Sequence, residues 1–297
     1  MPTVLLDTDI GSDVDDALAL AVLLGSPEVE LLGVTTAYGD TLLRARMARR
    51  LGRLAGRDLT VVPGAREPLS GREVWWAGHE GATMARLEEE EVRSDLSAPE
   101  FLAATCAARP GEVDVLSIAP MTDIALALRA DPDFAHTVRH LYVMGGSFAR
   151  PGGPPVEAEH NTRCDVVAAR EVFASAIPVT VTGLDVTTTV ELTPELVDRI
   201  AAAGEIGDQL HQQIQQWLTF WGAGWATPHD PVDVMALLRP ELFTTSAPGV
   251  VSIGAGEQEA VTVHEAHEDG TARVTTSVDV GTVGTEIADR IVRAGSR

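Results

Sequence analysis

Cysteine is scarce in this sequence, and no long apolar run is present. Only Cys106 and Cys164 among the 297 residues are cysteines, which excludes a disulfide framework and favours a reducing compartment, so we expect a cytoplasmic protein. No stretch resembles a secretory signal or a membrane span, and no membrane partner is expected. A chain of this length buries a full hydrophobic core without cross-links.

Positive charge is the second shortage. Lysine and arginine together number 22 against 44 aspartate and glutamate residues, which gives a net charge of −22. Such an acidic chain repels the phosphates of nucleic acid polymers and of anionic membranes, and we exclude both as partners. A neutral small molecule, or one bound with the help of a cation, is the expected ligand.

Short apolar segments alternate with helical segments through the first part of the chain. This alternation is typical of β-α-β units, whose strands lie parallel. The expected strands cover 4–6, 30–37, 59–62, 114–118, 141–144 and 179–183, and the expected helices cover 15–24, 42–54, 99–108, 124–129 and 166–174. The pattern predicts an α/β fold, an open and mostly parallel sheet flanked by helices, in one domain that spans 1–297.

The last third of the chain follows a different pattern. Residues 194–238 are mainly helical, and residues 250–278 alternate like antiparallel strands or a hairpin around 268–270. A final helix covers 282–292. We therefore expect a small antiparallel element near the C-terminus.

Two charged stretches are expected to face solvent, the arginines of the helix at 42–54 and the acidic run at 88–91, and residues 149–156 are expected to form a flexible loop. Charge runs of this kind are most simply solvated surface.

Five carboxylates lie within residues 7–16, between the first expected strand and the helix that follows it. A helix N-terminus favours negative charge, and Ser12 or Asp13 can cap it, which explains one or two of these acids. The others would repel one another unless a cation is bound, and carboxylate oxygens suit Ca²⁺ or Mg²⁺. We therefore expect a metal site in this turn rather than an acidic cap in solvent.

Further polar clusters follow other expected strands or begin helices. Their members are Asp40, Thr122, Asp123, Glu159, Asn161, His229 and Asp230. Because parallel strands place their carboxyl ends at one edge of a sheet, these side chains can line one pocket with the acidic turn. A cation there can acidify a water whose proton a neighbouring carboxylate accepts, and the remaining polar groups suit the hydroxyls of a sugar.

Five blocks, in this order along the chain, carry a resemblance to a known family. They are DTDIGSDVDDA at 7–17, GVTTAYG at 33–39, VMGG at 143–146, AEHN at 158–161 and HDP at 229–231. Together they resemble the nucleoside hydrolases, the inosine-uridine-preferring group and its ribosyl-pyrimidine relatives. The resemblance implies a Rossmann-like fold, a homodimer or homotetramer, and hydrolysis of nucleosides to free base and ribose in purine and pyrimidine salvage.

The resemblance also implies roles for single residues. Asp9 matches the family's general base and one of its Ca²⁺ ligands, and His229 matches the histidine that assists departure of the base. Further Ca²⁺ ligands would be Asp16, Asp230 and the backbone carbonyl of Thr122. The substrate-binding positions would be Asp15, Asp40, His79, Met144, Glu159 and Asn161, to which the tryptophan cluster at 217–225 adds Trp225 as a candidate platform for the base.

The family's reaction suits this set of side chains. Cleavage of an N-glycosidic bond builds positive charge on the ribose and negative charge on the leaving base. Carboxylates around the sugar stabilise the first charge, and an acid or hydrogen-bond donor serves the second. The same carboxylates disfavour a substrate phosphate, so nucleosides are expected over nucleotides.

Three departures from the family pattern bear on this interpretation. The segment 12–14 adds two residues before Asp15 and Asp16, which we keep as the pair because they are adjacent and lead into the helix. Asp40 stands where the family often has asparagine. Residues 152–153 are both glycine where the family has Gly-Asn, which removes a side chain that could hold the 5′ hydroxyl.

Two other functions stay open at this point. Asp7 and Asp9 resemble the opening of a haloacid-dehalogenase-type phosphatase, whose first aspartate is the nucleophile, but that interpretation leaves His229 without a role. The other is a non-catalytic protein that binds nucleosides or sugars through the same metal site. Whether the tryptophans at 217–225 pack in the core or stack on a base is also open.

Overall fold

The computed structural model describes residues 1–149, 156–256 and 259–296, and ten strands within these ranges form one sheet. The strands are β1 (Thr3–Thr8), β2 (Glu30–Thr36), β3 (Val61–Pro63), β4 (Val113–Ser117), β5 (Val138–Met144), β6 (Val179–Thr182), β7 (Phe243–Thr245), β8 (Gly249–Ile253), β9 (Thr262–Ala266) and β10 (Ala272–Val278). All six strands expected in the first part of the chain are present, and the predicted α/β fold is confirmed. Most of the loop expected at 149–156, with Gly152 and Gly153, lies outside the described residues.

The order of the strands reverses at β1. The sheet runs β3-β2-β1-β4-β5-β6, and each of these neighbouring pairs is parallel. The chain therefore winds outward from β1 in one direction and then returns to its other side with β4. In open parallel sheets a crevice forms at the carboxyl ends of the strands where the order reverses, so the loops after β1 and β4 flank that crevice.

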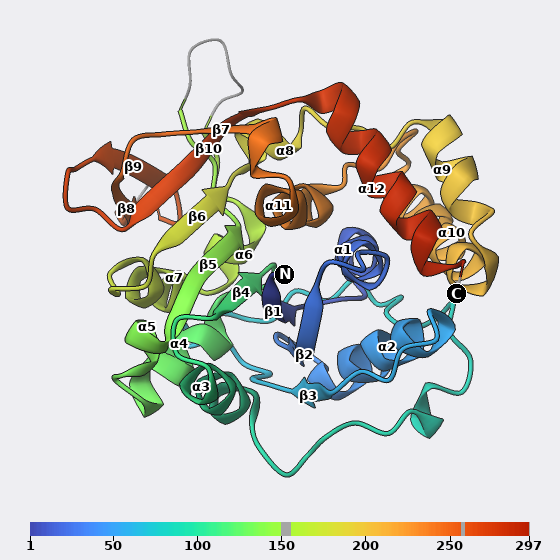
Figure 1. Ribbon diagram of the computed structural model, residues 1–297, viewed down its shortest axis with the longest axis horizontal. Helices are drawn as coiled ribbons and strands as arrows, with labels where there is room; N and C mark the ends of the chain where they lie inside the picture. The colour runs from blue at the N-terminus through green and yellow to red at the C-terminus, as the bar shows by residue number, and fades with distance from the viewer. Residues whose placement is uncertain (150–155, 257–258, 297) are drawn as a thin grey trace.

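Helices cover both faces of the sheet (Figure 1). They are α1 (Asp15–Leu24), α2 (Thr41–Leu54), α3 (Ala98–Ala108), α4 (Thr122–Ala130), α5 (Phe134–Thr137), α6 (His160–Cys164), α7 (Val166–Phe173), α8 (Leu184–Thr187), α9 (Pro194–Ala201), α10 (Gly204–Trp221), α11 (His229–Leu238) and α12 (Val280–Ala294), with short 3₁₀ turns at Leu87–Glu89 and Pro240–Leu242. One hydrophobic core contains side chains from α1, α2, α9, α10, α11 and α12, and a second contains side chains from α3, α4, α5 and α7. Of the helices in the described ranges, none has the length and apolar character needed to cross a bilayer.

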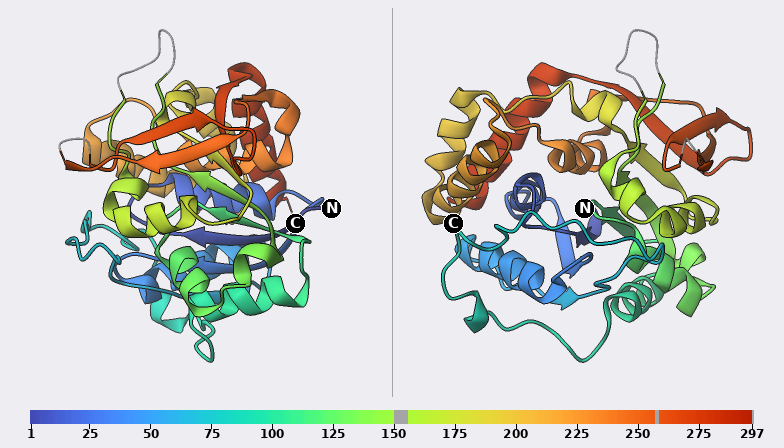
Figure 2. Two further views of the ribbon diagram at one scale, coloured as in Figure 1. Left: turned by 90° about the vertical axis from the view of Figure 1, so that its left-hand side faces the viewer. Right: turned by 180° about the vertical axis from the view of Figure 1, so that it is seen from behind.

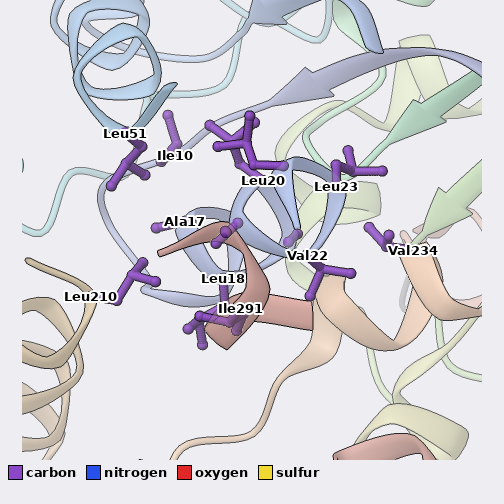
Figure 3. Close-up of a cluster of buried hydrophobic side chains, with 14 of the residues drawn as sticks. Ile10, Ala17, Leu18, Leu20, Val22, Leu23, Leu51, Leu210, Val234 and Ile291 are labelled. Carbon is purple, nitrogen blue, oxygen red and sulfur yellow. The ribbon is translucent and has the colours of Figure 1, made fainter. Parts of the chain in front are cut away.

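Helix α1 is buried on every side. All ten of its residues are buried, because α2, α11 and α12 pack around it against the sheet. Figure 3 shows Leu210, Val234 and Ile291, from α10, α11 and α12, around its side chains. A helix that is apolar all round belongs in a protein interior. The core therefore fixes the N-terminus of α1, which carries Asp15 and Asp16.

The small antiparallel element expected near the C-terminus is present, but it is not a hairpin around 268–270. Strands β8 and β9 form the hairpin, and it projects at one end of the sheet (Figure 2). The turn at 268–270 instead leads from β9 into β10, which pairs in parallel with β6 and antiparallel with β7. The predicted hairpin is wrong at this point because Ala272 and Val274 are buried, so β10 continues the core sheet beside β6.

Two charged stretches that were expected to face solvent are partly buried. Arg44, on α2, has no exposed surface. Glu90, in the acidic run, is 8% exposed because Arg50 and Arg53 form ion pairs with it. Full solvation was therefore wrong for both stretches, since a sequence shows which residues are charged but not what packs over them.

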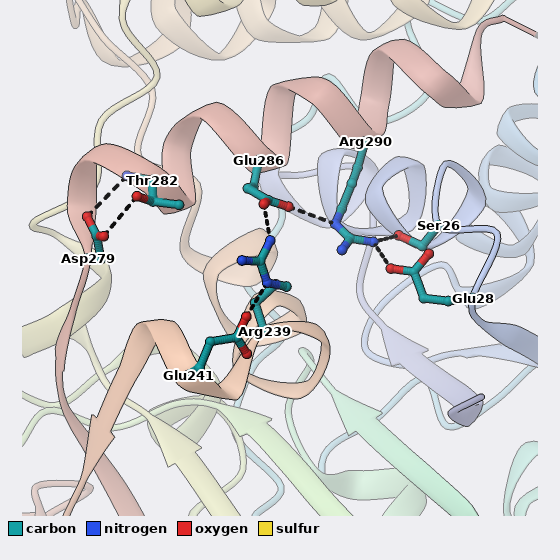
Figure 4. A network of polar contacts seen from close by, with 8 residues as sticks. All are labelled: Ser26, Glu28, Arg239, Glu241, Asp279, Thr282, Glu286 and Arg290. Atoms are coloured by element: carbon teal, nitrogen blue, oxygen red, sulfur yellow. Dashed lines mark hydrogen bonds and ion pairs between the residues drawn. The ribbon is translucent and has the colours of Figure 1, made fainter.

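Arg290, on α12, is a second buried arginine among the described residues. Its guanidinium donates to the Ser26 hydroxyl at 2.6 Å and forms ion pairs with Glu28 and Glu286 (Figure 4). These contacts tie α12 to the loop that follows α1. Arg290 thus has carboxylate partners and a structural role far from the crevice.

Asp233, on α11, is a buried carboxyl that lowers the stability of the folded protein at high pH. Burial raises its pKa to about 7, so the folded protein holds this proton more tightly than the unfolded chain does. The free energy of unfolding therefore falls as the pH rises from about 4, the pKa of an unfolded aspartate, to about 7. We expect Asp233→Asn to raise the free energy of unfolding at pH 8 by up to about 4 kcal/mol, and by much less at pH 5. Thermal melts at both pH values measure this difference. Equal effects of the substitution at pH 5 and pH 8 would contradict it.

Candidate active site

A cavity of about 400 Å³ opens at the carboxyl end of the sheet, where the strand order reverses. The site residues predicted from the sequence that line it are Asp9, Asp15, Asp16, Met144, Glu159, Asn161, His229 and Asp230. They come from the loop after β1, the end of β5, and the first turns of α1, α6 and α11. The fold therefore collects in one place residues from both ends of the chain.

Hydrogen bonds from the end of β1 hold the carboxylate of Asp16. The Thr8 hydroxyl donates to Asp16 Oδ1, and the Asp9 amide donates to the same oxygen at 3.1 Å. The Asp230 amide, in the first turn of α11, donates to Asp15 Oδ2 at 3.3 Å. One oxygen from each of Asp15, Asp16 and Asp230 lies within 4.8 Å of the other two. We call these three residues the acidic triad.

The acidic triad has the electrostatics of a cation site. Burial raises the pKa of Asp15, Asp16 and Asp230 well above the usual range, and repulsion by neighbouring carboxylates raises each further. Burial also raises the pKa of Asp13, at the edge of the cavity, to about 8. Buried oxygens that repel one another fit a divalent cation with oxygen ligands. The triad is therefore compatible with a metal site.

Two predicted metal ligands lie outside the triad. Asp9 lines the cavity, and its charge adds to the raised pKa of all three triad members. Thr122 begins α4, and its hydroxyl donates to Asp165 Oδ2 at 2.7 Å. Asp165 caps α7 and also accepts the amides of Leu69 and Ser70 at 2.7 and 3.0 Å. The roles of Asp9 and Thr122 as ligands stay predictions.

Asn161 is oriented by two backbone carbonyls. Its Nδ2 donates to the carbonyl oxygens of Ile118 and Met144, each at 3.2 Å. Because both amide hydrogens are used in this way, Oδ1 is left as an acceptor for the cavity. Such an acceptor suits the hydroxyl of a sugar.

Glu159 has a structural role that the sequence did not reveal. Its carboxylate accepts the amides of Asn161 and Thr162, at 2.6 and 2.9 Å, and so caps α6. It also accepts the Gly146 amide at 2.9 Å. Three backbone donors fix this carboxylate where it lines the cavity.

His229 lies at the start of α11 and is half-buried. Its Nδ1 is 2.7 Å from the Thr187 hydroxyl oxygen. Burial lowers the pKa of its imidazole to about 4, so the ring is neutral at pH 7. With Nδ1 engaged by Thr187, the nitrogen that remains for the cavity is Nε2.

Three predicted substrate-binding residues do not line this cavity. Asp40 accepts the Leu43 amide at 3.1 Å and thereby caps α2. His79 Nε2 is 2.8 Å from the Ser12 carbonyl oxygen, and its ring packs against Phe220 with 4.9 Å between centroids. Trp225 is 56% exposed. The substrate roles of these three residues stay predictions.

Several lining residues were not assigned to the site from the sequence, although two of them, Trp217 and Trp221, belong to the cluster whose stacking on a base was left open. The lining residues not assigned are Ser12, Asp13, Trp75, Ile118, Glu157, Ala158, His160, Arg163, Leu184, Trp217 and Trp221. Ile118 and Leu184 follow the carboxyl ends of β4 and β6. The sequence analysis considered only polar residues at strand ends, and the same reasoning applied to apolar residues would have found these two. Trp217 and Trp221 are four residues apart, which places them on one face of α10.

Two members of the tryptophan cluster, Trp217 and Trp221, form part of the cavity wall, and Trp217 also packs against the first hydrophobic core. Trp217 and Trp221 line the cavity and lie 5.6 Å apart between ring centroids. Phe220 and Trp221 are 45% and 60% exposed. Aromatic faces at this position can contact a planar ligand.

The phosphatase alternative is wrong. It requires Asp7 as an accessible nucleophile, but Asp7 has no exposed surface and does not line the cavity. Its Oδ1 accepts the Thr35 hydroxyl at 2.6 Å, and burial raises the pKa of the carboxyl well above its usual range. Asp7 therefore lies beneath the site rather than in it.

Comparison with known proteins identifies the family of this chain. The model of the inosine-uridine preferring nucleoside hydrolase family matches residues 4–284. The chain is 33% identical to uridine nucleosidase 1 of Arabidopsis thaliana over 262 residues, which cover 84% of this chain and 77% of that protein. It is also 33% identical to the pyrimidine-specific ribonucleoside hydrolase RihA of Citrobacter koseri over 257 residues, 82% of this chain and 81% of the relative.

A similar solved structure is the purine-preferring ribonucleoside hydrolase from Gardnerella vaginalis. It superposes with a TM-score of 0.88 and 27% sequence identity, over 99% of each chain. The relatives thus include a uridine nucleosidase, a pyrimidine-specific hydrolase and a purine-preferring hydrolase.

Proposed function

This chain belongs to the inosine-uridine preferring nucleoside hydrolase family, and we propose that it hydrolyses the N-glycosidic bond of ribonucleosides to free base and ribose. In this proposal Asp9 is the general base, His229 assists the departing base, and the metal is Ca²⁺. The observation that carries the proposal is that the buried acidic triad and His229 meet in one cavity. Oxygen ligands alone around the triad favour Ca²⁺ or Mg²⁺ over metals that prefer nitrogen or sulfur.

The acidic triad would hold the cation, with Asp9 and the Thr122 carbonyl as further ligands. When bound, Ca²⁺ lowers the pKa of a water molecule and holds sugar hydroxyls. Asp9 accepts the proton of the water that attacks C1′ of the ribose. It lines the cavity next to the triad and is 7% exposed, so it is accessible to a bound ligand but largely withdrawn from bulk water.

The sugar would be bound by fixed acceptors. Asn161 Oδ1 and the carboxylate of Asp15 accept hydrogen bonds from ribose hydroxyls, and Met144 packs beside the ring. Because the backbone already orients Asn161 and Glu159, little side-chain entropy is lost on binding. The carboxylates around the sugar also stabilise the positive charge that develops on it during cleavage.

The leaving base would be served by His229. A neutral imidazole with Nδ1 hydrogen-bonded to Thr187 donates from Nε2 to a base nitrogen, on which negative charge develops. Trp217 and Trp221 supply aromatic surface beside the base.

We expect His229→Ala to lower kcat for inosine by about a hundredfold. With p-nitrophenyl riboside, whose leaving group departs without a proton, the same substitution should change kcat by less than fivefold. Parallel kinetics on the two substrates measure this difference. Thr187→Val removes only the hydrogen-bond partner of Nδ1. It should lower kcat for inosine more than kcat for p-nitrophenyl riboside, but by a smaller factor than His229→Ala does. An equal decrease in kcat for both substrates would contradict the proposal that His229 assists departure of the base.

Release of ribose from a panel of nucleosides tests the proposed function. The panel should include inosine, guanosine, adenosine, uridine and cytidine, since the relatives act on both purine and pyrimidine nucleosides. Uridine 5′-phosphate is the matched control, because the carboxylates of the cavity disfavour a phosphate. Ribose from at least one nucleoside supports a hydrolase and identifies its base preference. Tight binding without release of ribose would establish a non-catalytic nucleoside-binding protein instead.

We also propose a cytoplasmic homo-oligomer. Cys106 and Cys164 are free and buried, and burial raises the pKa of each thiol to about 12, so neither is built for a disulfide. Light scattering measures whether two or four copies assemble.

A further inference from the structure

Arg44 is the largest fully buried side chain among the described residues, and its guanidinium lies directly behind the loop that carries Asp9. Burial of a guanidinium without a partner is strongly unfavourable. Yet none of the ion pairs found in the described ranges involves Arg44. Its charge is instead satisfied by neutral acceptors.

Those acceptors belong to the segments that form the cavity. Arg44 Nη1 donates to the carbonyl oxygens of Asp9 and Ile10, the second at 2.9 Å. Nη2 donates to the Ser12 hydroxyl at 3.2 Å, and Nε donates to the Tyr38 carbonyl at 2.7 Å. A single side chain therefore holds the loop after β1 and the turn after β2.

Each of these segments contains a residue with positive φ. Gly11 has φ +125°, and Tyr38 has φ +66°, which is unfavourable for a residue with a side chain. A Cβ at position 11 would lie 2.9 Å from Met47 Sδ, so the loop is packed closely against α2. Arg44 donates to the Ile10 carbonyl before Gly11, to the Ser12 hydroxyl after it, and to the carbonyl of Tyr38 itself, and these hydrogen bonds hold both conformations in place.

The guanidinium is itself held in place. Its carbon lies 4.8 Å from the centre of the Trp76 ring, within the range of a cation–π contact. The Ser12 hydroxyl that accepts from Arg44 donates in turn to Glu80 at 2.7 Å. The charge of Arg44 also acts to lower the pKa of Asp16, opposing the carboxylates that raise it. Arg44 thus connects the loop after β1 with the 76–80 segment that flanks it.

We propose that Arg44 is a positioning residue for this site: by fixing the carbonyls of Asp9 and Ile10 it sets the direction in which the Asp9 carboxylate faces the acidic triad. This inference rests on the proposed function. Loss of Arg44 should therefore weaken cation binding and slow turnover without a matching change in KM, because Arg44 does not line the cavity.

Arg44→Lys tests the proposal, and Arg290→Lys is its matched control. Both arginines are buried, and lysine keeps the charge but not the planar set of donors. Both substitutions should lower the melting temperature. Only Arg44→Lys should weaken Tb³⁺ and Ca²⁺ binding at least tenfold and, at saturating Ca²⁺, lower kcat at least tenfold with KM changed less than threefold. Arg290→Lys should leave all three quantities within twofold of the wild type.

Wild-type behaviour of Arg44→Lys in both cation affinity and kcat would overturn the proposal and leave Arg44 a core residue only. If Arg44→Lys does not fold, Trp76→Leu removes the contact that holds the guanidinium, and it should lower cation affinity and kcat at least threefold; no change in either would again overturn the proposal. If the wild type binds the cation but releases no ribose from any nucleoside, the proposed function fails, and the cation affinities alone decide the role of Arg44.

Discussion

Asp9→Asn should lower kcat for nucleoside hydrolysis by about a thousandfold, within the range of a lost general base. Asparagine has nearly the shape of aspartate but cannot accept the proton of the attacking water. The Asp9 amide, which donates to Asp16 Oδ1 at 3.1 Å, is unaffected, so the fold and most of the cation site should persist. Steady-state kinetics at saturating Ca²⁺, with a thermal melt of the variant, measure the effect.

Asp13→Asn is the matched control for this prediction. Asp13 lines the same cavity four residues further along, and its Oδ1 accepts the Val14 amide at 2.5 Å. We expect this variant to keep kcat within about tenfold of the wild type, as for a residue outside the chemical step. If Asp13→Asn were the inactive variant and Asp9→Asn the active one, the assignment of the base would move to Asp13.

Removal of the cation should abolish hydrolysis, and Ca²⁺ should restore it. Chelation leaves the carboxylates of the acidic triad facing one another without a counter-charge. A cation at one hundred times its dissociation constant stabilises the folded state by about 2.7 kcal/mol, so the melting temperature should also rise when Ca²⁺ is added back. Full activity in the presence of excess chelator would contradict the proposed metal dependence.

The chelated protein should in addition become less stable as the pH rises. The pKa of Asp15, Asp16 and Asp230 is raised in the folded state, first by burial and then by neighbouring carboxylates. Between about pH 4, the pKa of an unfolded aspartate, and those higher values, the folded protein binds more protons than the unfolded chain, so the free energy of unfolding falls with increasing pH.

Bound Ca²⁺ takes the place of those protons, and melts at several pH values should therefore show a shallower dependence with Ca²⁺ than with chelator. A residual slope should remain, because Asp233 lies outside the cavity and its raised pKa does not depend on the cation. Parallel curves with and without Ca²⁺ would contradict the placement of the cation at the triad.

Much of the fold could be predicted from the sequence because its signals are local. The run of apolar residues in α1 and the alternation of strand and helix up to β6 depend on neighbours along the chain. The hairpin around 268–270 could not be predicted correctly, because its strands take their partners from elsewhere: β9 pairs with β8, and β10 pairs with β6. Strand pairing is a long-range property that alternation alone does not specify.

The candidate site divides in the same way. The sequence determined the residue types, the acidic turn at 7–16 and the order of blocks that carries the family, since chemistry and spacing are written along the chain. Only the tertiary structure decided that Asp15 joins Asp16 and Asp230, and that Arg44, one of many arginines on α2, is the buried one. The burial of a side chain and its distance from other residues depend on contacts between segments that are far apart in the sequence. These two quantities distinguish a charged side chain on the surface from one that forms part of the site.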